Sequence, residues 1–360
     1  MAAPVRAAGT AGGGVAAAVG RALGRVRGAG RAGGGAVTPP ALVVDGVGRD
    51  YVDRKKVVTA LSEVSFTVGR GEIVGLLGVN GAGKTTLLRI IATLLTATRG
   101  RVLVDGVDVA ADPRAVRTRL SVVFGGDRGL YPRLSALDNA MLFGSLSGLP
   151  TKTLAPAARD ALASVGLLDV ADRSVGAFSK GMKQRLHLAV GLMARPALMM
   201  LDEPTVGLDP LETERLRSVV AKLPEEGVGV LLTSHNLQDI ERLASRVVIL
   251  RGGAVSHDLP LAALLEQSGA ATTVVVLSDS PCPVSADGDG QSGIRTLSSE
   301  RAGEEALWRT EFEVAEWTAE SLRELSRLWP AGAIRDVRVQ PVGLEQVFSR
   351  LAGPRTGEDG

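Results

Sequence analysis

The stretch Gly78-Val-Asn-Gly-Ala-Gly-Lys-Thr-Thr86 decides the fold. It fits the pattern G-x-x-x-x-G-K-[ST], in which a glycine-rich loop turns backbone amides toward phosphate oxygens and a lysine adds positive charge. A short apolar run, residues 73–77, precedes it, and residues 84–95 carry apolar side chains at helical spacing. A chance glycine-rich turn would lack these neighbours, so the pattern predicts a strand, a phosphate-binding loop and a helix.

Two acidic residues follow a second apolar run, in Leu198-Met-Met-Leu-Asp-Glu-Pro-Thr205. They fall at the carboxyl end of a predicted strand, where open α/β sheets bind ligands. Asp202 is suited there to hold Mg²⁺ through water, and Glu203 to act as a general base on an attacking water. For the pair in isolation, a solvated strand end is the alternative interpretation. Thr233-Ser-His235 follows another apolar run, at 228–232.

A further segment, Phe178-Ser-Lys-Gly-Met-Lys-Gln184, precedes residues with helical periodicity. On physical grounds alone, Ser179 is a helix N-cap, because its hydroxyl can accept from a free amide of the first turn. In their order and spacing, the four segments resemble the nucleotide-binding subunit of an ABC transporter, with 178–184 as a variant of the family's LSGGQ signature. The likeness covers residues 42–252 firmly and 270–352 loosely.

The resemblance implies an α/β fold: a P-loop NTPase domain with a mixed sheet and a helical insert, followed by a small α+β domain. It implies ATP and Mg²⁺ as cofactors, and hydrolysis of ATP to ADP and phosphate. Glu203 and His235 are then the expected catalytic residues, with structural packing as the alternative for His235. Thr85 and Asp202 are the expected metal ligands. The expected nucleotide contacts are Tyr51, Gly78, Asn80, Gly81, Ala82, Gly83, Lys84, Thr85, Thr86, Ser179, Gly181 and Asp209.

Several expected residues depend on the resemblance alone. Tyr51 stands where the family places an aromatic side chain under adenine, and a core tyrosine is the alternative. Asp209 belongs to a segment similar to the family's D-loop, which reaches across a dimer. The family also has a glutamine after a strand between phosphate loop and signature, but no glutamine lies between residues 85 and 183. We expect Gly126 at that position, with Asp127 or water as substitute; impaired hydrolysis is the alternative.

The chain divides by composition into a tail and two domains. Residues 1–40 are mostly alanine and glycine, with five arginines and no acidic residue. So few large apolar side chains cannot offset the entropy of ordering, which predicts a disordered tail. A mis-assigned start accounts for the same composition, and a weak contact with anionic lipid or nucleic acid is the alternative to both. We expect the ATPase domain at 41–253, with a helical subdomain at about 126–178, and the accessory domain at 270–352.

Composition also limits the partners. Aromatic residues make up 3% of the chain, too few for a base-stacking nucleic-acid platform, so we expect no nucleic-acid partner. No apolar run approaches the roughly 20 residues of a membrane span. The resemblance therefore implies a separate integral-membrane permease and a second ATPase subunit, most simply as a homodimer. It places the chain at the cytoplasmic face of the membrane, and the single cysteine, Cys282, is compatible with that reducing compartment.

The carboxyl-terminal segment refines the expected function. Pro341-Val-Gly-Leu-Glu-Gln-Val-Phe348 resembles the "SLEDVF" ending of ATP-binding subunits of ABC-2-type drug exporters. It predicts a subunit that powers export of a drug, antibiotic, lipid or polysaccharide, with import as the less favoured direction. A soluble ABC-type regulator or ribosome-linked resistance factor is the alternative, although such proteins usually carry two ATPase cassettes. A chromosome or repair ATPase would need a long coiled coil before the signature.

Overall fold

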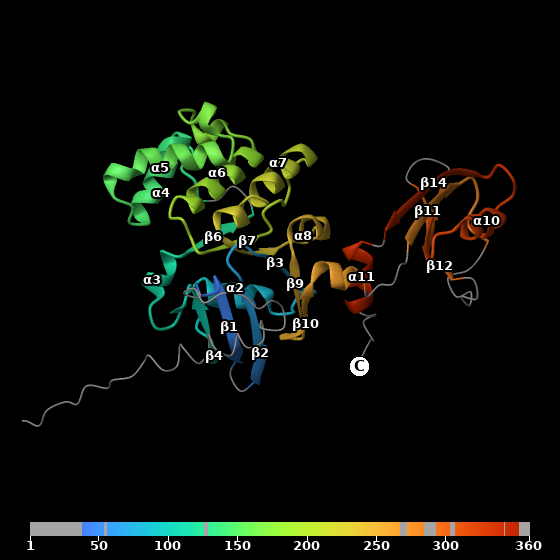
Figure 1. Cartoon of the computed structure of the whole chain (residues 1–360), viewed down its shortest axis with the longest axis horizontal. Helices are drawn as coiled ribbons and strands as arrows, with labels where there is room; N and C mark the ends of the chain where they lie inside the picture. Colours follow the sequence, from blue (N-terminus) through green and yellow to red (C-terminus); the bar gives the residue numbers. More distant parts are fainter. Residues whose placement is uncertain are drawn as a thin grey trace, which may run out of the picture. The chain divides into compact units, whose positions relative to one another are not determined.

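The computed structural model describes residues 38–53, 56–125, 129–266, 272–283, 293–302, 307–341 and 343–352. These residues form two compact units, one ending at Pro260 and the other beginning at Leu261 (Figure 1). That division falls between the expected domain limits of 253 and 270. Most of the expected 1–40 tail lies outside the described residues. No helix in the described part of the chain is long and apolar enough to span a bilayer.

A six-stranded sheet forms the centre of the first unit, in the order β10-β9-β3-β8-β7-β6. Its strands are β3 (Ile73–Leu77), β6 (Leu120–Phe124), β7 (Leu198–Asp202), β8 (Gly229–Thr233), β9 (Arg246–Arg251) and β10 (Ala254–Pro260). All neighbours pair in parallel except β10 with β9. Continuous apolar runs suit parallel strands buried on both faces, and the strands predicted from those runs are confirmed.

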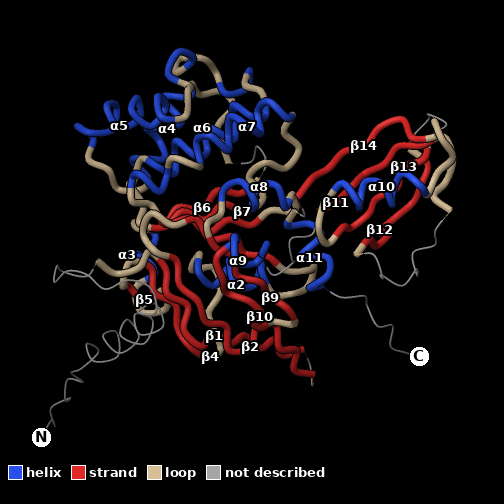
Figure 2. The backbone as a smooth tube through the Cα atoms, turned by 45° about the vertical axis from the view of Figure 1, so that its right-hand side comes forward, coloured by secondary structure: helices blue, strands red, loops and turns tan. Residues whose placement is uncertain are grey.

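A second, antiparallel sheet lies beside the first, in the order β2-β1-β4-β5 (Figure 2). It comprises β1 (Leu42–Asp53), β2 (Lys56–Val68), β4 (Arg99–Val104) and β5 (Val107–Asp108). Together the two sheets give the mixed α/β architecture that the resemblance implied. This second sheet was not predicted from the sequence, although β1 and β2 are the longest strands of the described chain.

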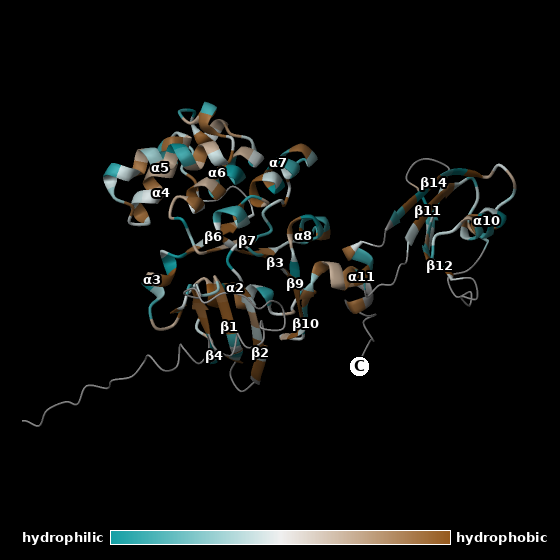
Figure 3. Cartoon of the chain, in the orientation of Figure 1, coloured by the Kyte–Doolittle hydropathy of each residue, from teal (hydrophilic) through white to brown (hydrophobic). Residues whose placement is uncertain are grey.

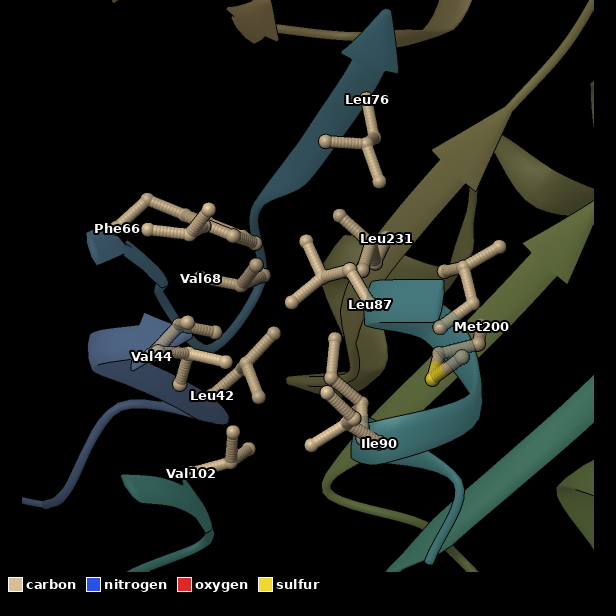
Figure 4. Packing of buried hydrophobic residues seen from close by; sticks show 14 of the residues in the cluster. Leu42, Val44, Phe66, Val68, Leu76, Leu87, Ile90, Val102, Met200 and Leu231 are labelled. Atoms are coloured by element: carbon tan, nitrogen blue, oxygen red, sulfur yellow. The ribbon is translucent and has the colours of Figure 1, made fainter. Parts of the chain in front are cut away.

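Helix α2 (Lys84–Ile91) lies between the two sheets and joins them into one core. Figure 4 shows Leu87 and Ile90 packed between apolar side chains of the antiparallel sheet and those of the central strands. Full burial of each such side chain contributes roughly 1.5–3 kcal/mol. The helix is shorter than the predicted 84–95, because Thr93 has a left-handed backbone, with φ of 62°.

The described part of the first unit contains six further α-helices. Their bounds are α3 (Pro113–Arg117), α4 (Ala136–Leu146), α5 (Thr151–Ser164), α6 (Lys180–Leu192), α7 (Pro210–Val220) and α8 (Leu237–Leu243). Short 3-10 turns lie at Leu168–Val170, Val175–Ala177 and Leu223–Glu226. Ser135 is the N-cap of helix α4, because its hydroxyl accepts from the amide of Asp138 at 3.0 Å.

The second unit contains a four-stranded antiparallel sheet in the order β12-β13-β11-β14. Its elements are α9 (Leu261–Glu266), β11 (Thr272–Ser278), β12 (Ile294–Arg301), β13 (Trp308–Val314), α10 (Ala319–Arg327), β14 (Ile334–Pro341) and α11 (Leu344–Ala352). A separate core forms here, in which Phe312 and Trp329 meet edge to face at 5.9 Å. Figure 3 shows the apolar positions of β11 in brown and much of α10 in teal.

Candidate functional site

The phosphate loop connects the end of β3 to the start of α2, and it packs closely against β2. The amide of Ala82 donates to the carbonyl of Val79 at 3.1 Å, which closes a turn of the loop. Gly83 has φ of 101°, and a Cβ atom there would lie 2.7 Å from the carbonyl oxygen of Ala60. Only glycine combines this left-handed backbone with so close an approach. The first turn of α2 therefore starts at Lys84 with its free amides facing the loop.

Lys84 lies in the loop, near the acidic end of the neighbouring strand. Its Nζ donates to the carbonyl oxygen of Gly78 and, at 3.4 Å, to that of Val79. Burial lowers the pKa of Lys84 from its ordinary value of 10.5, while the carboxylates of Glu203 and Asp202 act in the opposite direction. The loop lysine and both predicted acidic residues are thus brought together, as a site for a metal–phosphate complex requires.

Asp202 is oriented by the neighbouring strand. It pairs in register with Thr233, whose Oγ1 donates to Asp202 Oδ1 at 2.6 Å. On the other side, the amide of Gly125 donates to the backbone carbonyl of Asp202 at 2.7 Å. Thr233 is almost fully buried, so this hydrogen bond is protected from solvent. The carboxylate is therefore held in one orientation, and carboxylate and hydroxyl oxygens are ligands that Mg²⁺ accepts.

Glu203 and His235 lie in contact. The amide of His235 donates to Glu203 Oε2 at 2.9 Å, and His235 Nε2 lies 3.4 Å from Glu203 Oε1. Glu203 adopts a left-handed backbone with φ of 55°, and its amide donates to the carbonyl of Thr233 at 3.1 Å. The carboxylate can accept a proton from a water, and the exposed imidazole can contact the same water or a phosphate.

The signature segment caps α6. Ser179 Oγ accepts from the amide of Met182 at 3.1 Å, which confirms the predicted N-cap. At Gly181, an added Cβ atom would lie 2.6 Å from Cγ and 2.7 Å from Cβ of Glu212, so α6 and α7 meet where only glycine fits. The buried Gln184 donates from Nε2 to the carbonyl of Phe124 at 3.2 Å. Helix α6 is thereby joined to the end of β6.

Two expected residues make contacts of their own. Asp209 Oδ1 accepts from the amide of Glu212 at 2.9 Å and caps α7. Tyr51 is partly exposed on β1, and the Arg49 guanidinium lies 4.8 Å from its ring centroid, a cation–π contact. The expected positions of Gly126 and Asp127 lie outside the described residues.

The family described as "ABC transporter" matches residues 61–206. The ABC transporter ATP-binding protein NatA of Bacillus subtilis (strain 168) is 40% identical over 218 residues, which cover 61% of this chain and 89% of NatA. The Daunorubicin resistance ATP-binding protein DrrA2 of Streptomyces coeruleorubidus is 34% identical over 303 residues, covering 82% of this chain and 91% of DrrA2. The chain belongs to the ABC transporter family.

This ABC ATPase also resembles solved structures of the family. One is described as the dimeric post-hydrolysis state of an ATP-binding cassette bound to ADP and Pi; its TM-score is 0.54, with 26% sequence identity. The match covers 61% of this chain and 98% of that cassette. The fold class and the ATP-binding, ATP-hydrolysing activity expected from the motifs are confirmed by these relationships.

The structure adds residues that the motifs did not identify in this ABC ATPase. Thr233 was quoted only as part of the segment that leads to His235, and its bond to Asp202 is a tertiary contact between strands. Arg49 contacts the ring of Tyr51, two positions away, and Gln184 donates to the carbonyl of Phe124, 60 positions away. Asp239, a buried acid on α8, had no sequence signal, because a lone acid on a short helix normally faces solvent.

Proposed function

We propose that this ABC ATPase powers an ABC-2-type exporter whose membrane-spanning permease is a separate chain. The match with DrrA2 carries the proposal. It covers 82% of this chain, and the first unit ends at residue 260 of 360, so the similarity extends into the second unit. DrrA2 is named as a daunorubicin resistance protein. A drug, an antibiotic, a lipid or a polysaccharide is the class of cargo that we propose.

Two copies of the subunit would enclose two ATP molecules at the cytoplasmic face of the membrane, where they bind the permease. In each site the phosphate loop of one copy would face Ser179 and the amino-terminal end of α6 of the other. The free amides of a helix start favour an anion. Asp209 would cross the same interface, and a homodimer is the simplest arrangement. Since ATP has higher affinity for the closed dimer, its binding closes the dimer and its hydrolysis reopens it.

Within each site, the loop amides and Lys84 would hold the phosphates, and Tyr51 would stack on adenine with the ring face that Arg49 does not cover. Thr85 and the oriented Asp202 would hold Mg²⁺, whose charge offsets that of the phosphates. Glu203 would take the proton of the attacking water, while His235 would contact that water and the γ-phosphate.

Replacement of the proposed base tests this function. We expect Glu203→Gln to bind ATP as the native protein does and to lose hydrolysis by 10²-fold or more, since it cannot accept the proton. With its membrane partner, the variant should accumulate as an ATP-bound dimer, detected by light scattering. Glu214→Gln, which changes an exposed carboxylate on α7, is the matched control. A Glu203→Gln protein that stays monomeric at saturating ATP contradicts the proposal.

A further inference from the structure

A buried carboxylate on α8 is bound by four donors. Asp239 is fully buried, and its Oδ1 accepts from Nε and Nη2 of Arg217 at 2.8 and 2.5 Å. Its Oδ2 accepts from Thr205 Oγ1 at 2.5 Å and from Ser234 Oγ at 2.7 Å. The guanidinium neutralises the charge, and the two hydroxyls satisfy the other oxygen. Such an arrangement is costly to break, because each partner left alone would be a buried, unpaired polar group.

The two hydroxyls belong to the two segments that carry the candidate catalytic pair. Thr205 lies two residues after Glu203, and Ser234 directly precedes His235. One oxygen atom of Asp239 therefore binds both segments at once. Ser234 Oγ also accepts from the amide of Asn236 at 3.0 Å, which fixes the turn that contains His235.

Helix α8 gives this carboxylate a fixed position. Ile240, the next residue, is fully buried, and a Cβ atom at Gly75 on β3 would lie 2.6 Å from its Cγ2. The helix is thus packed against the strand that leads into the phosphate loop. Arg217 is also almost fully buried on α7, so the opposite side of the carboxylate is held equally firmly.

We propose that Asp239 is a positioning residue for ATP hydrolysis. By holding Thr205 and Ser234 on one oxygen, it sets the separation of the Glu203 carboxylate and His235. The inference rests on the proposed function, in which these two residues act on the attacking water. A role in folding alone would stabilise α7 and α8 without an effect on the Glu203–His235 contact.

The test removes each hydroxyl while the Arg217–Asp239 pair stays intact. We expect Ser234→Ala and Thr205→Val to lower kcat roughly tenfold to a hundredfold, because small displacements of catalytic groups have such effects. The Kd for ATP should change less than twofold. Ser234→Thr and Thr205→Ser keep a hydroxyl and should restore kcat to within about threefold, since the hydrogen bond is retained. The double variant should resemble each single variant, because both act through one contact.

A second measurement needs no nucleotide. The amide of His235 is hydrogen bonded to Glu203 Oε2, so its hydrogen-exchange rate reports the contact directly. We expect this rate to rise in Ser234→Ala and Thr205→Val, while amides of β9 exchange as in the native protein. Glu214→Gln is the control: Glu214 lies 3.5 Å from Arg217, yet its side chain is 55% exposed.

The outcomes separate the two proposals. Native kcat and native His235 exchange in both hydroxyl-free variants would overturn the positioning role. Faster His235 exchange in those variants, with a native protein that shows no hydrolysis even with its permease, would show that Asp239 controls the Glu203–His235 contact and would overturn the proposed function.

Discussion

Lys84 is a partly buried cation beside two carboxylates, and this environment predicts a pH effect on ATP binding. Burial lowers the pKa of Lys84 below 10.5, so its charge is lost at a lower pH than that of an exposed lysine. Only the charged form attracts phosphate, so ATP affinity should fall as the pH rises through that lowered pKa. The same shift makes the nucleotide-free fold gain stability between the lowered pKa and 10.5, where the unfolded chain holds more protons.

Titrations of ATP between about pH 7 and pH 10.5 check this effect, over a range in which lysine but not arginine can lose its proton. Lys84→Arg is the control, because a guanidinium keeps its charge throughout and should abolish the alkaline loss of affinity. A loss of the same size in Lys84→Arg would show that another group is responsible.

The site residues that could be predicted from the sequence lie in contiguous motifs. Glu203 and His235, predicted from segments 32 positions apart, are in contact, and both predicted acids influence Lys84. Their proposed roles remain predictions. Asp239 was missed because its burial depends on Arg217, 22 residues away on another helix. No local pattern encodes such a partner, whereas a phosphate loop encodes its own backbone path.

Among elements, the contact between α6 and α7 depends on one glycine. A methyl group at Gly181 would lie 2.6–2.7 Å from Cγ and Cβ of Glu212, which the buried pair with Arg185 at 3.2 Å holds in place. We therefore expect Gly181→Ala to lower the free energy of unfolding by about 1–3 kcal/mol, as overpacking does. Denaturant unfolding of the first unit measures the change.

The neighbouring position supplies the control for Gly181→Ala. Lys180 is exposed in the first turn of the same helix, so Lys180→Ala should change the free energy of unfolding by less than about 0.5 kcal/mol. Equal effects of the two substitutions would mean that α7 moves away at no cost. In that case, the close approach of α6 and α7 would not constrain this position.

Elements with a strong local signal were predicted well. Strand β3 has the predicted bounds, Ile73–Leu77, because five apolar residues lead directly into the phosphate loop. Strand β12 was missed, since Ile294–Arg301 is mostly polar and lies at the edge of its sheet. The β1–β2 sheet was also missed. Its pairing contains register shifts, and these disturb the alternation that a sequence argument needs.

For the whole molecule, the two units have separate cores, and all three tryptophans lie in the second unit. Tryptophan fluorescence therefore follows unfolding of that unit alone. We expect Phe312→Ala to lower its stability by about 3–5 kcal/mol, because a buried ring that contacts Trp329 is lost. The Kd for ATP should stay unchanged, since the expected nucleotide contacts all belong to the first unit.

A core substitution in the first unit completes the comparison. Leu231→Ala, in the buried middle of β8, should destabilise the first unit and leave the fluorescence transition in place. If both substitutions shift the fluorescence transition equally, the two units unfold as one, and the separate cores do not correspond to separate cooperative units.

The left-handed backbone at Glu203 lowers the stability of the fold at the position of the proposed catalytic base. Non-glycine residues in that conformation cost of order 1–3 kcal/mol, and glycine at 203 would relieve much of it. Glu203→Gly would therefore raise the thermal stability of the protein and at the same time remove the proposed base for ATP hydrolysis. With glutamate at this position, every folded molecule contains a strained backbone, and the proposed role of this side chain in ATP hydrolysis is the benefit that offsets the strain.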